Sequence, residues 1–437
     1  MIRPAPGVLG TAGRKKAGRG KVAATKPARA ATKAAGGATH SVRAEPVEAR
    51  TVALVDTLER VEVPVTPDVV EVIPAAQGDH AYPVRVGPGA IDVLPELLDG
   101  VDRVVLVSCK PVLATPFGQA FAGRLEGQAG FAGTIVLPDG EAGKTLAQLE
   151  KAAVQLLQSG ATRRSLVVGL GGGAVTDAAG FLAATFMRGI RWVAVPTTVL
   201  AMVDAAIGGK TAVNLPVAKN AVGAFHPPIA VLADPDALAT LPQRERASGK
   251  GEVIKYGALQ PGLLDTFASA CARPTISAAI LATCARMKVD VVADDPTEQG
   301  PRKLLNLGHT YGHGVEAAGG FSRYTHGEAV AVGLAYAFRL ARRLGRVDDA
   351  AVERVEAALV KAGLPVAVPE KLARAALGHM AFDKKRTAAG LRWVLPRSEG
   401  RGWRVEWDVE ADAAAVEATA AEVVSKERRP AGRGRRS

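Results

Sequence analysis

The sequence predicts an α/β domain followed by a mostly α-helical domain, and three observations lead to this fold class. Short apolar runs alternate with segments of helical periodicity between about residues 66 and 238. A glycine-rich turn at 169–174 joins one of these runs to a helix. From about residue 239 the periodicity is almost wholly helical. Alternating strands and helices indicate a parallel sheet with helices on its faces, and the cleft between two domains is the default place for a site.

The elements follow from local patterns. Buried strands are expected at 103–108, 133–138, 165–170, 191–196 and 229–234. A helix over 145–160 carries its leucines on one face and ends at Gly160, and another follows the glycines at 174–186. In the second domain we expect helices near 242–257, 274–292, 303–317, 327–344 and 349–362, and a small hairpin from 391–396 and 402–407.

Composition narrows the class of protein. Of the 437 residues, 48% are hydrophobic and 22% are charged, which is ordinary for a globular protein with a substantial core. No apolar run reaches the roughly 18–20 residues that span a bilayer, so we expect no membrane partner. The three cysteines have no ligand spacing and an odd count, which favours a reducing compartment and hence the cytoplasm.

The net charge of +12 lies in the two ends of the chain. Residues 1–50 carry +9 and residues 426–437 carry +5, which leaves −2 for the rest. We therefore expect a disordered, low-complexity basic tail at 1–65, an α/β domain at 66–238, an α-helical domain at 239–421 and a basic tail at 422–437. The first tail has no apolar core of a secretory signal, and a transit peptide is an open alternative. Neither tail contains a base-reading module, so no specific nucleic-acid partner is expected.

The turn "GLGGGA" matches the pattern G-x-G-x-x-G/A through Gly169, Gly171 and Ala174. Glycines between a strand and a helix let the backbone approach a pyrophosphate at the helix N-terminus. The acid expected after the next strand is missing, because that strand runs into Thr197 and Thr198. A phosphate or nucleotide site and a tight turn that merely needs glycine both remain open at this point.

Charged residues follow in a segment broken by Gly and Pro. Asp204, Lys210, Lys219 and Asn220 lie in "VDAAIGGKTAVNLPVAKN", and with Arg188 they could hold an acidic, phosphorylated small molecule. A solvated loop is the alternative. In "GEVIKYG", Glu252 and Lys255 share a helical face, which usually means an exposed ion pair.

Three of the seven histidines lie within eighteen residues, at His309, His313 and His326. His309 and His313 share one helix face at i, i+4, as two metal ligands on one helix do. Gly308 and Gly312 beside them cost helix propensity, about 1 kcal/mol each, which indicates close packing or ligand approach. Spacing alone predicts His309, His313 and His326 as the metal set, with Glu316, Glu328 or Glu252 as a fourth ligand.

Taken together, these motifs resemble the 3-dehydroquinate synthase family of sugar-phosphate cyclases. The resemblance rests on "PDGEAGKT", "GGGAVTDAAGF", "RGIRWVAVPTTVLAMVDAAIGGKTAVN", "KNAVGAFHPP", "SGKGEVIKYG", "NLGHTYGH", "HGEAVAVGL" and "DKK", in the family's order over about residues 66–410. It implies a Rossmann-like NAD-binding domain and a helical metal-binding domain. It also implies a carbon–oxygen lyase of the shikimate pathway, in aromatic amino acid biosynthesis, with NAD and one divalent metal, zinc or cobalt.

The resemblance also implies roles for individual residues. The metal ligands would be Glu252, His309 and His326, whereas His313 would face substrate. NAD contacts would come from Glu141, Lys144, Gly172, Gly173, Asp177, Thr197, Thr198, Lys210, Lys219 and Thr240. Substrate contacts would come from Arg188, Asp204, Lys210, Lys219, Asn220, Lys255, Lys288, Arg302, Asn306, His313 and one of Lys384 and Lys385. The sequence departs from the family where Cys109 and Lys110 stand in place of a common Asp or Asn.

The implied reaction converts 3-deoxy-D-arabino-heptulosonate 7-phosphate to 3-dehydroquinate and phosphate. It would proceed by transient oxidation with NAD, phosphate elimination, re-reduction, ring opening and intramolecular aldol closure. Three alternatives stay open: a sibling cyclase acting on another sugar phosphate, a metal-dependent alcohol dehydrogenase, and a nucleic-acid-binding protein acting through its tails. The sequence leaves the oligomeric state open, with a homodimer as one option.

Overall fold

The five predicted strands are present as consecutive parallel strands of a seven-stranded sheet. The computed structural model describes residues 70–216, 218–380, 386–387 and 390–425, all within the compact unit Val47–Ser437. The strand order is β1-β2-β9-β6-β5-β3-β4, with only β1 and β2 antiparallel. The strands are β1 (Glu71–Gln77), β2 (His80–Val86), β3 (Val104–Cys109), β4 (Phe131–Leu137), β5 (Leu166–Gly171), β6 (Arg191–Pro196) and β9 (Ala230–Ala233).

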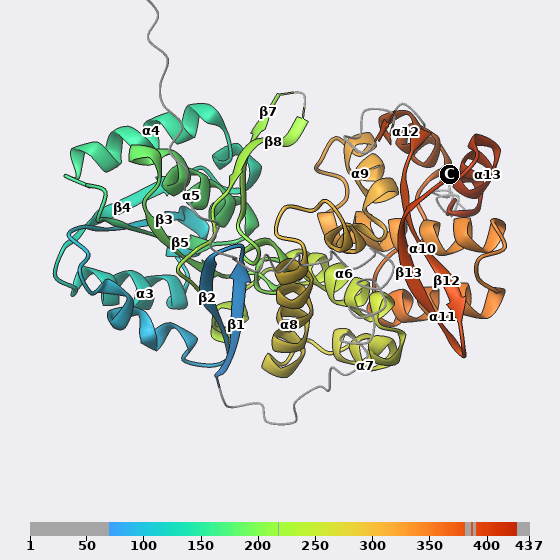
Figure 1. The fold of residues 1–437 in the computed structure, drawn as a ribbon, viewed down its shortest axis with the longest axis horizontal. Coiled ribbons are helices and arrows are strands. Elements are labelled where there is room, and N and C mark those ends of the chain that lie inside the picture. The colour runs from blue at the N-terminus through green and yellow to red at the C-terminus, as the bar shows by residue number, and fades with distance from the viewer. Residues whose placement is uncertain (1–69, 217, 381–385, 388–389, 426–437) are drawn as a thin grey trace, which may run out of the picture. The chain divides into compact units, whose positions relative to one another are not determined.

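Alternate residues of the central strands enter two different cores, as the two-residue period of a strand requires. In β3, Val104 and Leu106 pack with the helices on one face, whereas Val105 and Val107 pack with those on the other. The first face is covered by η1 (Ala90–Leu98) and α3 (Pro116–Glu126), and the second by α4 (Leu146–Gln158) and α5 (Gly173–Thr185) (Figure 1). The short helix α2 (Lys110–Leu113) follows β3.

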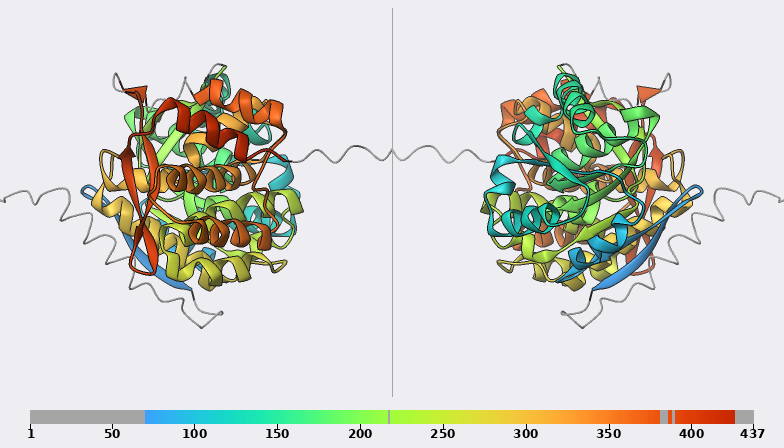
Figure 2. Two further views of the ribbon diagram at one scale, coloured as in Figure 1. Left: turned by 90° about the vertical axis from the view of Figure 1, so that its right-hand side faces the viewer. Right: turned by 90° about the vertical axis from the view of Figure 1, so that its left-hand side faces the viewer.

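The second part of the unit is helical, as predicted. Its helices are α6 (Gln243–Leu259), α7 (Leu264–Cys271), α8 (Ala278–Asp294), α9 (His309–Ala318), α10 (His326–Arg343), α11 (Asp349–Lys361), α12 (Glu370–Met380) and α13 (Ala413–Glu422). α8 packs against β1, and one core runs from the sheet into these helices (Figure 1). The predicted hairpin is present as β12 (Trp393–Glu399) and β13 (Gly402–Val409), beside α10 (Figure 2).

The structure adds elements that the sequence patterns did not predict. β7 (Lys210–Leu215) and β8 (Ala218–Phe225) form an antiparallel hairpin where we expected a loop, and β10 (Arg386–Thr387) pairs with β11 (Gly390–Leu391). The helix predicted over 303–317 is two elements, η7 (Pro301–Asn306) and α9, because Gly308 adopts φ 79° between them. The tails expected at 1–65 and 426–437 lie outside the described residues, and the domain boundaries stay a prediction.

Candidate functional site

The glycine-rich turn lies at the carboxyl end of β5, where α5 begins. A side chain at Gly172 would lie 3.1 Å from Thr198 Cγ2, and one at Gly173 would lie 3.2 Å from Ala205 Cβ. The Thr197 amide donates to the Gly171 carbonyl over 2.9 Å, which holds the ends of β5 and β6 together. The two glycines therefore allow tight packing around a helix N-terminus, and a helix N-terminus is the geometry that favours an anion.

Two charged side chains of the predicted NAD set meet beside this turn. Lys144, which follows η2 (Gly140–Gly143), forms an ion pair with Asp177 of α5 and a hydrogen bond with Asn220 of β8. Burial raises the pKa of Asp177, although the Lys144 cation opposes this change. Glu141 Oε2 accepts from Asn214 Nδ2 over 2.5 Å. The loop after β4, helix α5 and the β7–β8 hairpin thus converge at one place.

Other predicted residues are not linked to this convergence. Arg188 is exposed at the end of η3 (Phe186–Arg188) with φ 70°, and the described part of the chain gives it no ion pair. Thr240 is exposed in the turn after η5 (Pro235–Leu238). Lys384 and Lys385 lie outside the described residues. The roles of all four residues stay predictions.

Glu252, His309 and His326 converge from three different helices. Glu252 is fully buried in α6, and its Oε1 lies 3.5 Å from His309 Nε2 and 3.3 Å from His326 Nε2. One potential ligand atom from each residue lies within 4.8 Å of the other two. His309 begins α9, and His326 begins α10 behind the capping box of Thr325 and Glu328. Both histidines therefore sit at helix starts that approach α6.

Charges inside this cluster are strongly coupled. Burial alone would raise the pKa of Glu252, but Lys255 and His309 outweigh it and lower the pKa to about 2. Burial alone would lower the pKa of His326, but the carboxylates of Glu252 and Glu316 raise it to about 10. Burial holds the pKa of His309 well below its usual value. The cluster therefore holds a permanent buried carboxylate with positive charge drawn toward it.

The cluster fits a divalent metal by the chemistry of its donors. Lys255 forms an ion pair with Oε2 of Glu252, whereas Oε1 faces the two imidazoles and accepts no hydrogen bond from the described residues. A buried carboxylate oxygen without a hydrogen bond is one that a metal ion can satisfy. One carboxylate and two imidazoles match the ligand preference of Zn²⁺ and leave room for substrate oxygens.

His313 is the point where spacing and geometry differ. Its ring centroid lies 5.4 Å from that of His309 and 6.1 Å from that of His326, and its side chain is exposed. It belongs to a second possible ligand group with Glu316 and His326, but it is not grouped with Glu252. The set predicted from spacing alone, His309, His313 and His326, is therefore not one that the geometry groups. The geometry does group the set implied by the family resemblance, namely Glu252, His309 and His326.

Buried cations surround the cluster on the sheet side. Lys288 of α8 forms an ion pair with Asp204 of the π-helical turn η4 (Ala201–Ala205), and its Nζ lies 2.8 Å from the Asp204 carbonyl oxygen. Lys255 is fully buried beside Glu252, so it is not the exposed pair that helix spacing usually indicates. Arg302 is 1% exposed and donates to the carbonyls of Gly208 and Pro296. Burial lowers the pKa of Lys288 to about 8.

Sequence reasoning missed Glu298. This residue has φ 62° and forms an ion pair with Lys210 of β7, while its Oε1 accepts from Asn306 Nδ2 over 2.6 Å. Lys210 and Asn306 are both predicted substrate residues, so a carboxylate of the chain stands among groups expected to hold an anion. No spacing rule pairs residues 88 positions apart, and only the fold brings Lys210 and Glu298 together.

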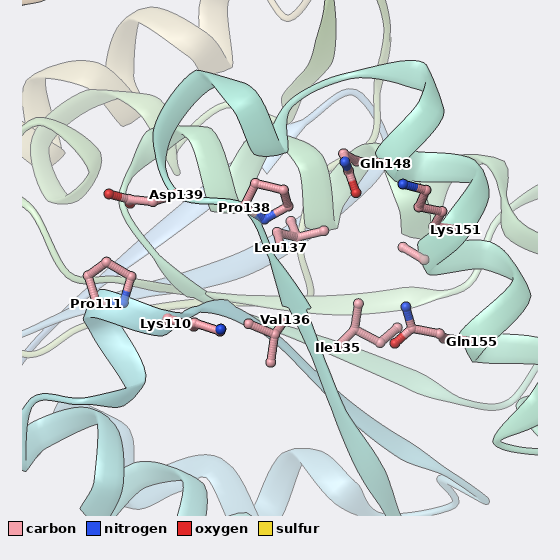
Figure 3. A pocket seen from close by; sticks show the side chains of 11 residues that line it. Lys110, Pro111, Ile135, Val136, Leu137, Pro138, Asp139, Gln148, Lys151 and Gln155 are labelled. Carbon is pink, nitrogen blue, oxygen red and sulfur yellow. The ribbon is translucent and has the colours of Figure 1, made fainter.

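A pocket lies away from this cluster, along the edge strand β4 (Figure 3). Its volume is about 670 Å³, and α4 and the start of α2 complete its wall. It is lined by Lys110, Pro111, Ile135, Val136, Leu137, Pro138, Asp139, Gln148, Lys151, Ala152 and Gln155. Lys110 is one of the residues that depart from the family pattern, but none of the predicted metal ligands lines this pocket.

Family models match most of the unit just described. Residues 134–248 match the N-terminal part of 3-dehydroquinate synthase, and residues 249–386 match its C-terminal part. The chain belongs to the 3-dehydroquinate synthase family. The two matches meet inside α6, three residues before Glu252, so that the family's C-terminal part contributes all three members of the Glu252 cluster.

Solved structures of other cyclases share the fold. The chain is 27% identical to 2-epi-5-epi-valiolone synthase from Streptomyces hygroscopicus subsp. jinggangensis, which has NAD⁺ and Zn²⁺ bound; the match has a TM-score of 0.67 and covers 80% of this chain and 98% of that one. It is 23% identical to a 2-deoxy-scyllo-inosose synthase complexed with carbaglucose-6-phosphate, NAD⁺ and Co²⁺, with a TM-score of 0.65 over 81% and 100% of the two chains. Glycerol dehydrogenase from Schizosaccharomyces pombe is more distant, at 17% identity and a TM-score of 0.56 over 77% and 86%.

Among the described residues, no helix combines the length and the apolar character needed to cross a membrane.

Proposed function

We propose that the chain is a sugar-phosphate cyclase that uses NAD and one divalent metal, zinc or cobalt, and that its substrate is 3-deoxy-D-arabino-heptulosonate 7-phosphate. The products would be 3-dehydroquinate and phosphate. The observation that carries the proposal is the convergence of one buried carboxylate and two imidazoles beside buried Lys and Arg side chains, in a member of this family. The predicted role in the shikimate pathway and the cytoplasmic location belong to the same proposal.

The metal and the dinucleotide have separate places in this proposal. A metal held by Glu252, His309 and His326 would supply Lewis-acid polarisation of a substrate oxygen, and NAD at the turn of Gly172 and Gly173 would supply reversible hydride transfer. The chain's own contribution is to exclude water and to hold the substrate. Lys255 is fully buried, so its interaction with an anion is much stronger than in bulk water.

Two carboxylates of the chain pair with cations of the predicted substrate site, and we expect a substrate anion to take over these contacts. Asp204 neutralises Lys288, and Glu298 neutralises Lys210 and accepts from Asn306. A phosphorylated, carboxylated sugar brings enough negative charge to exchange with both. Because the pKa of Lys288 is about 8, this lysine is a cation at pH 7 and can hold an anionic oxygen.

The choice of substrate rests on three residues that match the dehydroquinate-forming pattern, namely Lys288, Asn306 and His313. A charge-assisted contact left unpaired in a buried site costs on the order of a few kcal/mol. The heptulosonate phosphate should therefore exceed sedoheptulose 7-phosphate and glucose 6-phosphate in kcat/KM by at least about a hundredfold.

The decisive assay measures phosphate release from all three sugar phosphates, with and without a chelator, while NADH absorbance is followed. The proposal expects chelator-sensitive release from the heptulosonate phosphate and no accumulation of NADH. Comparable kcat/KM values for the three sugars would indicate a cyclase of another branch. Stoichiometric NADH would indicate a dehydrogenase instead.

A further inference from the structure

Five side chains form a continuous chain of polar contacts from the dinucleotide side of the molecule to the predicted metal ligands. Lys219 Nζ lies 3.7 Å from Glu141 Oε1 and 3.3 Å from Glu316 Oε1. Glu316 Oε2 lies 3.2 Å from His326 Nδ1, and His326 Nε2 lies 3.3 Å from Glu252 Oε1. Each contact joins a different pair of elements, so the chain links the β7–β8 hairpin to α6 through α9 and α10.

Glu316 is the central member, and each of its oxygens contacts a different partner. It lies on α9, and its side chain is 6% exposed. Its Oε1 faces Lys219, and its Oε2 faces His326. Glu316 is therefore a buried carboxylate with one basic partner on each side.

The contact with His326 fixes which ring nitrogen faces the Glu252 cluster. With Nδ1 directed to Glu316, Nε2 is directed to Glu252. A carboxylate on the remaining nitrogen of a ligating histidine sets its tautomer and ring orientation, and loss of such a partner weakens metal affinity by about 10- to 100-fold. The capping box of α10 fixes the backbone of His326 but not the rotation of its ring.

The contact with Lys219 ties α9 to the β7–β8 hairpin. Lys219 Nζ also lies 4.5 Å from the centre of the Phe321 ring, just beyond α9. The hairpin carries Asn220, which contacts Lys144 beside the glycine-rich turn. In Figure 1 the yellow-green hairpin stands between α5 and α9. Lys219 of this hairpin contacts both Glu141 and Glu316.

We propose that Glu316 is a positioning residue that orients His326 for the metal and, through Lys219, couples metal binding to dinucleotide binding. The inference rests on the proposed function, because it assumes that both groups bind. Coupling between two sites is reciprocal, so NAD⁺ must tighten the metal by the same factor by which the metal tightens NAD⁺.

The test titrates Co²⁺ into metal-stripped, full-length protein, with and without NAD⁺, and records the visible spectrum of the bound Co²⁺. Wild type should bind Co²⁺ at least about fivefold more tightly when NAD⁺ is present. Glu316→Gln should bind it about 10- to 100-fold more weakly with an altered spectrum. Glu316→Asp should recover part of this loss. The matched control is Glu370→Gln, whose carboxylate is 61% exposed on α12 and should behave as wild type.

A second variant, Lys219→Met, removes the contact with the hairpin and leaves Glu316 in place. Because Lys219 is also a predicted NAD contact, this variant is titrated at NAD⁺ concentrations that saturate it. It should bind Co²⁺ as wild type does without NAD⁺ and lose most of the tightening when NAD⁺ is bound. Full tightening in Lys219→Met, or wild-type affinity and spectrum in Glu316→Gln, would overturn the inference while leaving the proposed function intact. A wild-type protein that binds neither Co²⁺ nor NAD⁺ would overturn the proposed function as well.

Discussion

At the scale of the residue, the structure distinguishes two predictions of which clustered histidines bind the metal. Helix periodicity places His309 and His313 on one face. A metal ligand must also lie close to the other ligands, and these come from different helices. Of the three clustered histidines, His309 and His326 approach the buried carboxylate of Glu252. The ring of His313 is exposed nearby, where it can meet a substrate.

This difference predicts the metal content of two variants. His309→Ala should lose most of its bound metal, because one of three ligands is removed. His313→Ala should retain metal and lose activity. Elemental analysis of both purified variants and of wild type distinguishes the two predicted ligand sets. Equal loss of metal in both variants would favour the set predicted from spacing.

Glu298 predicts an effect on anion affinity. Its carboxylate occupies the surroundings of Lys210 and Asn306, so Glu298→Gln removes a negative charge that competes with a bound anion. Inorganic phosphate should bind roughly tenfold more tightly, which corresponds to about 1.4 kcal/mol. Calorimetric titration measures this, with the exposed Glu399→Gln as control. Weaker phosphate binding would mean that Glu298 supports the anion site rather than filling it.

At the scale of the element, the site depends on two close contacts, one within a loop and one between helices. The loop before η7 is held by Asp295, whose oxygens accept from the amides of Gln299, Gly300 and Arg302 over 2.9, 2.7 and 3.2 Å. The helices α9 and α10 meet at glycines, since a side chain at Gly333 would overlap the carbonyl oxygen of Gly308. Both contacts set the positions of predicted site residues.

The Asp295 loop predicts a pH-dependent loss of stability. Burial opposes ionisation of Asp295, but three amide donors lower its pKa below the unfolded value. Its stabilising effect is therefore fully present above the unfolded pKa of about 3.9 and is lost as the pH falls through the folded pKa. Asp295→Asn should lower the free energy of unfolding by about 1–3 kcal/mol at pH 7.

Urea denaturation at pH 7 and at pH 3 checks this prediction, with the exposed Asp79→Asn as control. The difference between Asp295→Asn and wild type should shrink at the lower pH. A difference that grows as the pH falls would contradict the assignment.

The glycine contact predicts a second effect on stability. Gly333→Ala should cost about 1–3 kcal/mol, because α10 must move away from α9 to admit a methyl group. The same movement should weaken metal binding through His309 and His326. Gly378→Ala on α12 is the matched control, since nothing lies within 4 Å of the added atom and alanine favours a helix by up to about 1 kcal/mol. Unfolding midpoints of the two variants should therefore shift in opposite directions.

At the scale of the whole molecule, positive charge is concentrated in the two ends of the sequence. The basic ends carry +9 and +5, while the remainder carries −2. The cationic groups of the predicted site are thus local features rather than part of a general positive field. The basic ends have no counterpart in the family match, which covers residues 134–386.

This segregation predicts that the ends are dispensable for catalysis. A protein lacking residues 1–60 and 426–437 should keep the kcat and KM of the full chain. It should also lose any weak, salt-sensitive retention on nucleic acid, since that depends on clustered Lys and Arg. Steady-state kinetics and retention on immobilised DNA test both parts. A large drop in kcat/KM would show that an end of the chain takes part in the reaction.

The sequence by itself was enough for the fold class and the central strands. The strand centres 104–107 and 166–168 are apolar at every position, and a strand covered on both faces needs this pattern whatever its neighbours are. The glycine-rich turn could also be predicted, because its spacing reflects a local strand–turn–helix geometry. The β7–β8 hairpin was missed, because much of β8 is exposed and its sequence lacks the apolar alternation of a half-buried strand.

Only the tertiary structure decided which charged groups meet. Glu252 lies 57 residues before His309, and Lys219 lies 97 residues before Glu316, so neither contact leaves a signal in local periodicity. The resemblance implied the first group of residues but not Glu298 or Glu316 as partners of the site. Local propensity acts over a few residues, whereas a buried charge is satisfied by whatever group the packing of distant helices places beside it, and that is determined only when the whole chain is folded.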